Sequence, residues 1–153
     1  MGVTDRIVRS LLASDVPLER EALTAAASAI VPDVAPLAGP EEITDAVDAL
    51  AGLGPVERLL RDPEVTDVLV TGGDPMVMNA KALRNYLSPL LSPEFSHVQN
   101  IRIGTKSVAY WPQRYVTDKD SDDVLRLFDD VRKAGRHLAI MGHYNHPAEL
   151  RTH

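Results

Sequence analysis

Residues that could bind a ligand gather in three short stretches of the sequence, at positions 71–75, 104–114 and 142–147. The first stretch, TGGDP, joins two glycines, Gly72 and Gly73, to the carboxylate of Asp74. Glycine lets a backbone approach a ligand closely, and a carboxylate can accept hydrogen bonds from an ammonium group. The same residues also fit a tight turn between a strand and a helix, with Asp74 as the helix cap. The spacing does not match the dinucleotide pattern G-x-G-x-x-G, so no nucleotide site is predicted.

The second stretch and the strand before it bring three cations, Arg102, Lys106 and Arg114, toward one region of the chain. Such a group suits a carboxylate or a phosphate. The alternative is that side-chain alternation along a strand leaves some of them in solvent or in structural ion pairs. We expect Trp111 to pack this loop.

The third stretch contains HYNHP, with His143, Asn145 and His146. Histidines three residues apart could bind a divalent metal together with Asp74, if that residue ends a neighbouring strand. We favour histidines that contact a ligand or make structural hydrogen bonds, and we predict no metal site.

Each stretch follows a predicted strand in an alternating pattern of strands and helices. Strands are expected at 68–71, 98–103 and 137–141, and helices at 81–91 and 118–133, the second helix ended by Gly135. The apolar positions predicted to face the core are Leu83, Leu87, Leu90 and Leu91 in one helix and Val124, Leu125, Phe128 and Val131 in the other. Strand starts about 30 to 40 residues apart are typical of right-handed βαβ crossovers, so the sheet should be parallel. In a parallel sheet the loops after the strands share one edge, where ligands bind.

The part of the chain before residue 67 has a different pattern, typical of helices. Helices are expected at 4–13, from Pro17 to just before Pro32, and from Pro40 to Gly52, which would adopt a left-handed cap. One more turn should begin at 54–55. The predicted fold is therefore α/β: a helical segment over 1–66, then a parallel βαβαβ unit over 67–153.

Composition limits the functions open to this chain. The 153 residues carry a formal net charge of −6, which argues against a general nucleic-acid binder. There is no cysteine, so cysteine-ligated clusters and disulfides are excluded within these residues. No apolar run is as long as a membrane span and no signal peptide is evident, so we expect a cytoplasmic protein that is not bound to a membrane.

The segment GLGPVERLLRDPEVTDVLV, at 52–70, is similar to the region that precedes the catalytic core in secretion ATPases of the CpaF/TadA type. The resemblance covers about 4–70. It implies an accessory helical domain. A phosphate-binding loop is missing from the 153 residues, because the run at 104–107 has an extra residue between Gly104 and Lys106, so ATP hydrolysis is not predicted.

From about residue 70 onward, three segments resemble the radical S-adenosylmethionine enzymes of the lysine 2,3-aminomutase family: VTGGDPMVM, NIRIGTKSVAYWPQR and MGHYNHPAEL. The resemblance implies part of a (β/α) barrel and an enzyme that uses a [4Fe–4S] cluster, S-adenosylmethionine and pyridoxal phosphate. It also implies a group of cofactor-binding residues: Gly72, Gly73, Asp74, Arg102, Gly104, Thr105, Lys106, Gln113, Arg114, Asn145 and His146.

The chain departs from this family where the family's reactive parts should be. The cysteines that hold the cluster would lie upstream of GGDP, where this chain has the ATPase-like segment, and the lysine that anchors pyridoxal phosphate would lie beyond residue 153. We therefore assign no catalytic residue and expect a junction of two fragments that retains, at most, weak binding of S-adenosylmethionine or an amino acid.

The alternative is an acidic module, either accessory-like or inhibitor-like, that contacts a protein partner. A three-stranded fragment would also expose a sheet edge through which the protein could self-associate.

Overall fold

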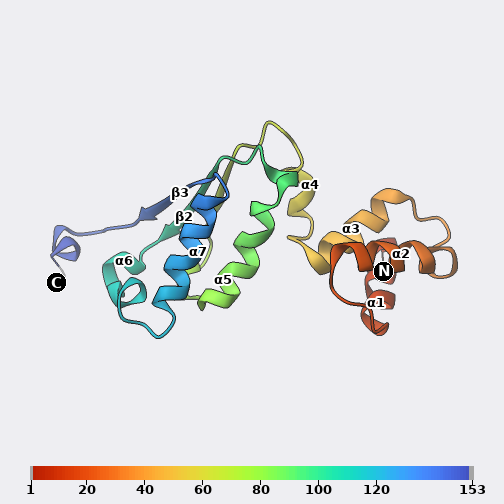
Figure 1. Ribbon diagram of the computed structural model, residues 1–153, viewed down its shortest axis with the longest axis horizontal. Coiled ribbons are helices and arrows are strands. Elements are labelled where there is room, and N and C mark those ends of the chain that lie inside the picture. Colours follow the sequence, from red (N-terminus) through yellow and green to blue (C-terminus); the bar gives the residue numbers. More distant parts are fainter. Residues whose placement is uncertain (1, 152–153) are drawn as a thin grey trace. The chain divides into compact units, whose positions relative to one another are not determined.

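The computed structural model describes residues 2–151, and the chain forms two compact units, residues 1–60 and residues 61–153 (Figure 1). The first unit is helical and the second combines helices with a sheet. Each unit is described by itself.

Between residues 2 and 60 the chain folds into a small helical bundle. Its helices are α1 (Val3–Ala13), α2 (Arg20–Val34), α3 (Pro40–Ala51) and α4 (Val56–Leu60). The first three helices pack against one another through an apolar stripe on each. The buried core comprises Ile7, Leu11, Leu23, Ala27, Val31, Ala35, Ala46 and Val47.

The helix predicted from Pro17 to just before Pro32 begins at Arg20 and continues to Val34, so both predicted ends are wrong. Proline removes one intrahelical hydrogen bond because it lacks an N–H. Pro32 lies in the last turn, next to the buried Val31, and the Val31 carbonyl accepts a 2.9 Å bond from the Ala35 N–H. Packing of that turn into the core therefore outweighs the missing bond.

The predicted left-handed cap at Gly52 is also wrong, since Gly52 has φ −131° and Gly54, at φ +62°, is the left-handed residue. Gly52 is needed for a different reason. A Cβ at this position would lie 1.6 Å from Oε1 of Glu57, whose carboxylate accepts the Leu53 N–H at 2.9 Å. The close approach of a buried side chain, rather than backbone conformation, requires the glycine.

Two acidic side chains are buried in this unit and share one arginine. Arg20 donates to Asp48 at 2.6 Å and to Glu57 at 2.5 Å, and these carboxylates are 2% and 0% exposed. Burial raises the pKa of Glu57, and Asp48 beside it adds to this effect against the opposing bonds from Leu53 and Arg20.

The second unit contains a parallel sheet, as predicted. Its strands are β1 (Asp67–Val70), β2 (Asn100–Thr105) and β3 (His137–Gly142), in the order β1-β2-β3. In the register, Val70 pairs with Ile103 and Ile103 with Ile140, so all three strands end at the same edge of the sheet.

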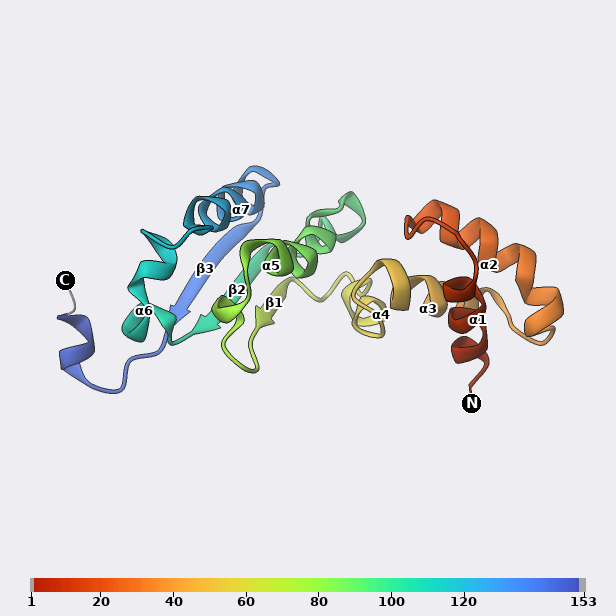
Figure 2. The ribbon, with the colours of Figure 1, turned by 90° about the horizontal axis from the view of Figure 1, so that it is seen from below.

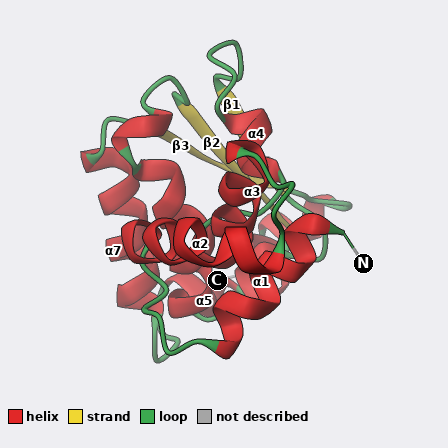
Figure 3. Ribbon diagram, turned by 90° about the vertical axis from the view of Figure 1, so that its right-hand side faces the viewer, coloured by secondary structure: helices red, strands yellow, loops and turns green. Residues whose placement is uncertain are grey.

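Helices α5 (Ala80–Leu87) and α7 (Ser121–Lys133) lie on the same face of this sheet (Figures 2 and 3). The core between them includes Leu83, Leu87, Ile101, Ile103, Val124, Leu127 and Val131. The core-facing positions predicted for the helix at 118–133 were partly wrong: Leu125 is 48% exposed and Leu127 is fully buried. Buried positions at 124, 127 and 131 repeat every three or four residues, as one helix face requires.

Two predicted element boundaries also change in this unit. The expected helix over 81–91 is α5 followed by the short 3₁₀ turn Ser88–Leu91, because Pro89 cannot continue the hydrogen-bond ladder. The expected loop after β2 contains the helix α6 (Ser107–Tyr110) and the 3₁₀ turn Pro112–Tyr115.

The other face of the sheet has side chains in solvent. Leu69 and Met141 are 51% and 47% exposed there, and Arg102, the partner of Leu69 in the register, lies on the same face of the central strand. Within residues 2–151, no helix is both long and apolar enough to cross a bilayer.

Candidate ligand-binding site at the carboxyl ends of the strands

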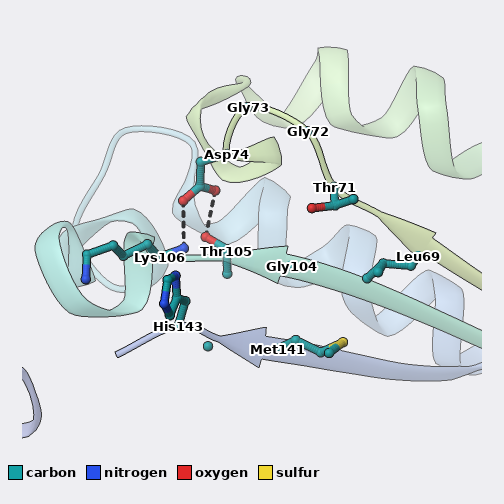
Figure 4. Close-up of a pocket in the computed structure, with 11 residues that line it drawn as sticks. Leu69, Thr71, Gly72, Gly73, Asp74, Gly104, Thr105, Lys106, Met141 and His143 are labelled. Atoms are coloured by element: carbon teal, nitrogen blue, oxygen red, sulfur yellow. Dashed lines mark hydrogen bonds between the residues drawn. The ribbon is translucent and has the colours of Figure 1, made fainter. Parts of the chain in front are cut away.

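The three stretches singled out in the sequence follow β1, β2 and β3, and parts of each meet at one edge of the sheet. They line a cavity of about 460 Å³ that is open to solvent on the uncovered side of the sheet (Figure 4). Its lining residues are Leu69, Thr71, Gly72, Gly73, Asp74, Gly104, Thr105, Lys106, Met141, Gly142 and His143. The size falls within the usual range of small-molecule sites.

Asp74 ties the first loop to the second. Its carboxylate accepts hydrogen bonds from the Thr105 hydroxyl at 2.6 Å and from the N–H groups of Lys106 and Ser107 at 2.8 and 3.0 Å. It also accepts the Met76 N–H at 3.0 Å, as cap of the 3₁₀ turn Pro75–Val77. The capping interpretation is therefore confirmed, and the carboxylate bridges two loops in addition.

These bonds determine the charge state of Asp74. Burial raises its pKa, but the hydrogen bonds from Thr105, Met76, Lys106 and Ser107 outweigh burial, so the pKa lies below the usual range of an aspartate. The carboxylate is thus a fixed anion whose lone pairs are largely occupied by the protein.

A buried chain of hydroxyl groups supports this anchor. Thr105 Oγ1 lies 2.7 Å from Ser107 Oγ, which lies 2.6 Å from the Tyr115 hydroxyl. Neither Ser107 nor Tyr115 was among the residues predicted for this site. Their signal is weak in the sequence, because a serine and a tyrosine eight residues apart become neighbours only when α6 folds the loop back.

The first loop leaves free space beside its glycines. A Cβ added to Gly72 or Gly73 would meet no protein atom within 4 Å. Gly72 has φ +119°, a backbone conformation that favours glycine, whereas Gly73 lies outside the left-handed region. The space next to Gly73 is therefore open to a ligand and is not needed by the protein.

The apolar part of the cavity comes from residues that were not predicted from the sequence. Leu69 and Met141 stand on the uncovered face of the outer strands, and Gly104 lies between them on β2. A Cβ on Gly104 would come 3.3 Å from the Thr71 hydroxyl oxygen, so the absence of a side chain at Gly104 leaves space in the cavity above β2. Strand alternation and register could have predicted Leu69 and Met141, since both share a face with Gly104.

Lys106 carries the permanent positive charge among the described residues that line the cavity. Its ammonium is paired with Glu149, at 3.0 and 3.1 Å from the two carboxylate oxygens. The Asn145 N–H donates to the same carboxylate at 2.8 Å. This N–H and then Lys106 hold the pKa of Glu149 below its usual range.

The other two cations predicted for this edge lie elsewhere. Arg102 pairs with Asp67 at 2.6 Å on the uncovered face of the sheet and does not line the cavity. Arg114 is 1% exposed and donates to the Met76 and Met78 carbonyls at 2.9 Å and to Asp120 at 2.7 Å.

All three cations are thus in ion pairs, as the alternative of structural ion pairs predicted. The Arg114 guanidinium also lies 5.6 Å from the centre of the Trp111 ring, which packs the loop. Gln113 is exposed next to Arg114, outside the cavity lining.

The histidines of the third stretch are separated. His143 lines the cavity, and its N–H donates to the Thr105 carbonyl at 2.9 Å. His146 instead caps the 3₁₀ turn Pro147–Leu150, accepting the Ala148 N–H on Nδ1 at 3.1 Å, and Asn145, which precedes His146, is exposed. Within residues 2–151, no group of three or more His, Asp or Glu side chains is arranged to hold a metal ion.

Together these residues form a site with an apolar floor and a polar rim. Leu69, Met141 and Gly104 provide the floor, and His143 and Lys106 provide donors at the rim. The arrangement can bind a small molecule that has both an apolar portion and an anionic group.

Comparison with known proteins shows similarity in the C-terminal part of the chain. Over 95 residues, 62% of this chain, it is 36% identical to a protein of Aquifex aeolicus that carries a provisional L-lysine 2,3-aminomutase assignment, and it covers 24% of that protein. It is 34% identical to the glutamate 2,3-aminomutase of Clostridioides difficile and 33% identical to the L-lysine 2,3-aminomutase of Methanococcus maripaludis over the same length, covering 20% and 19% of them.

The chain thus spans about a quarter or less of the length of these relatives. No protein-family model matches the sequence, and no solved structure matches it. The resemblance of the N-terminal part to secretion ATPases stays a prediction.

Proposed function

We propose that residues 61–153 form part of an aminomutase-like (β/α) barrel that binds S-adenosylmethionine or an amino acid weakly, without catalysing a reaction by itself. One observation carries the proposal: parts of the three stretches that resemble the aminomutases line one cavity of about 460 Å³ at the carboxyl edge of a parallel sheet. Ligands of parallel α/β folds bind at that edge.

The cavity fits such a ligand chemically. An amino acid and the methionine end of S-adenosylmethionine both combine aliphatic carbons with a carboxylate and an ammonium. Leu69 and Met141 can contact the aliphatic part, and Lys106 can pair with the carboxylate. The open space beside Gly73 lets the ligand approach the backbone of the first loop.

The iron–sulfur cluster of the resembling enzymes does not fit these residues. Its iron atoms are held by cysteine thiolates, and the 153 residues contain none. Any cluster would need ligands from outside these residues. We propose no pyridoxal phosphate site either, because the cavity lining offers one lysine and that lysine is paired with Glu149.

The test is a titration of the purified chain with S-adenosylmethionine by calorimetry, comparing the wild type with Gly73→Ala. The new methyl group would enter the cavity without touching the protein. Since overpacking a filled site costs roughly 1–3 kcal/mol, we expect Kd to rise at least about fivefold. An unchanged thermal melt serves as the control. A folded wild-type protein that gives no saturable heat contradicts the proposal.

A second function is favoured by the distribution of charge. Residues 1–60 contain four arginines and no lysine against ten Asp and Glu side chains, a formal charge of −6, whereas residues 61–153 carry twelve of each sign. The whole net charge therefore belongs to the helical unit. We propose that this unit contacts a basic protein partner, as an accessory domain of a secretion ATPase or an inhibitor would.

Charge reversal in the full chain tests the second function. Glu41 and Asp45 are exposed on α3, and Asp122 and Asp123 are exposed on α7. Replacing the α3 pair by lysine should abolish co-purification of the partner, and replacing the α7 pair should not. Equal loss from both changes would mean that net charge alone, rather than the helical unit, governs the association.

A further inference from the structure

The ion pair between Lys106 and Glu149 occupies the ammonium that a ligand would need. This inference rests on the function proposed for the cavity. Residues 142–150 are exposed except for Glu149, whose side chain is 27% exposed against 33% for Lys106. Glu149 therefore attaches an otherwise solvent-exposed segment to the rim of the cavity.

The segment that carries Glu149 is internally hydrogen-bonded. The Asn145 N–H donates to the Glu149 carboxylate at 2.8 Å, and the Glu149 N–H donates to the His146 carbonyl at 3.0 Å. His146 Nδ1 accepts the Ala148 N–H at 3.1 Å. These bonds lie within residues 145–149, so they form a short local turn whose amides should lose protection when it separates from Lys106.

The backbone and the side chain of Lys106 are held by different acids. Its N–H donates to Asp74 at 2.8 Å, which fixes the residue at the end of β2, while its ammonium goes to Glu149. In Figure 4 the Lys106 side chain extends away from Leu69 and Met141. Its flexible stem would let the ammonium turn toward the cavity once Glu149 is released.

We propose that Glu149 is an internal competitor that a ligand carboxylate has to displace from Lys106. Binding then exchanges one carboxylate for another at the same ammonium and releases the turn at 145–149. The favoured ligands are therefore those with a free carboxylate. Without a ligand, Glu149 neutralises the positive charge of Lys106.

The test compares Glu149→Gln with the wild type in calorimetric titrations of S-adenosylmethionine and of its decarboxylated analogue. An exposed ion pair is worth little, so S-adenosylmethionine should bind the variant about two- to fivefold more tightly. The analogue, which cannot replace Glu149, should bind both proteins equally. Glu94→Gln is the matched control, because Glu94 pairs with Arg61 at 2.9 Å and does not line the cavity.

Hydrogen–deuterium exchange gives a second measurement on the same proteins. Saturating S-adenosylmethionine should speed exchange at 143–150 in the wild type, and Glu149→Gln should show fast exchange there without ligand. Equal affinity of both proteins for S-adenosylmethionine, with the turn still protected in the complex, overturns the inference and leaves the proposed function intact. No binding by either folded protein overturns both.

Discussion

At the scale of single residues, Asp74 shows how one carboxylate can organise a candidate site. It accepts bonds from Met76, Thr105, Lys106 and Ser107, and so connects the loops after two neighbouring strands. Charge-assisted bonds of this kind are stronger than neutral ones. We propose Lys106 and His143 as the donors that face a ligand, and Asp74 holds the backbone of Lys106 directly.

We predict that Asp74→Asn destabilises the second unit by about 1–3 kcal/mol, because a charged acceptor and its bonds to backbone N–H groups are lost. Since the pKa of Asp74 is lowered in the folded state, its contribution is present at neutral pH and is lost as pH falls through that lowered value. Urea unfolding followed by Trp111 fluorescence measures the change, because Trp111 is the one tryptophan of the chain.

The control for this change is Asp123→Asn. Asp123 and its partner Arg126 are 59% and 66% exposed, so the free energy of unfolding should move by less than about 1 kcal/mol. Equal effects of both substitutions would contradict the role given to Asp74.

Glu57 leads to a pH prediction of the opposite sign for the first unit. Its pKa is raised by burial and by Asp48, so the folded state holds a proton that the unfolded chain releases. The free energy of unfolding should therefore decrease as pH rises from the usual glutamate pKa through the raised value. Far-UV circular dichroism in urea between acid and neutral pH measures this.

Glu57→Gln should flatten that pH dependence, because the amide cannot ionise. Glu41→Gln, at an exposed position on α3, should leave the dependence as it is in the wild type. A wild-type curve that rises over the same pH range would contradict the assignment of the proton to Glu57.

At the scale of elements, two glycines differ in backbone conformation: Gly135 at the end of α7 and Gly73 in the loop after β1. Neither Gly135 nor Gly73 has a protein atom within 4 Å of an added Cβ, but Gly135 has φ +78° whereas Gly73 lies outside the left-handed region. Gly135 ends its helix in the left-handed conformation, as its position after Lys133 predicted.

We predict that Gly135→Ala destabilises the second unit by about 1–2 kcal/mol, the cost of a left-handed conformation for a residue with a Cβ. Gly73→Ala should change the stability little. Gly135→Asn should recover part of the loss, because asparagine tolerates this conformation. Urea unfolding of the three variants decides the matter, and equal destabilisation by both alanine substitutions would contradict the conformational explanation.

At the scale of the whole molecule, the sheet is covered by helices on one face and its outer strands, β1 and β3, are edges within the described residues. Unpaired edges promote pairing between chains. We propose that copies of the chain associate through the β3 edge, where Ile140 is 37% exposed.

We expect sedimentation equilibrium to give an average mass that rises with protein concentration. Ile140→Lys should shift the protein toward the monomer, since an edge lysine opposes strand pairing, and the exposed Leu125→Lys on α7 is the control. A wild-type protein that stays monomeric throughout would contradict association through this edge.

Much of the architecture was determined by local sequence. The alternation of strands with amphipathic helices predicted the parallel sheet and the edge where the three loops meet, because hydrophobic periodicity and connection length are local properties. Gly135 and Asp74 were also identified locally, as a helix stop and a cap.

Tertiary structure alone decided how charged side chains are used. Arg102, Lys106 and Arg114 are close in sequence, yet they pair with Asp67, Glu149 and Asp120 in three different places. The partners of Arg102 and Lys106 lie 35 and 43 residues away along the chain. An ion pair depends on where two separate elements are brought together, so the sequence could name the cations of this edge, and only the fold could show that one of the three reaches the cavity.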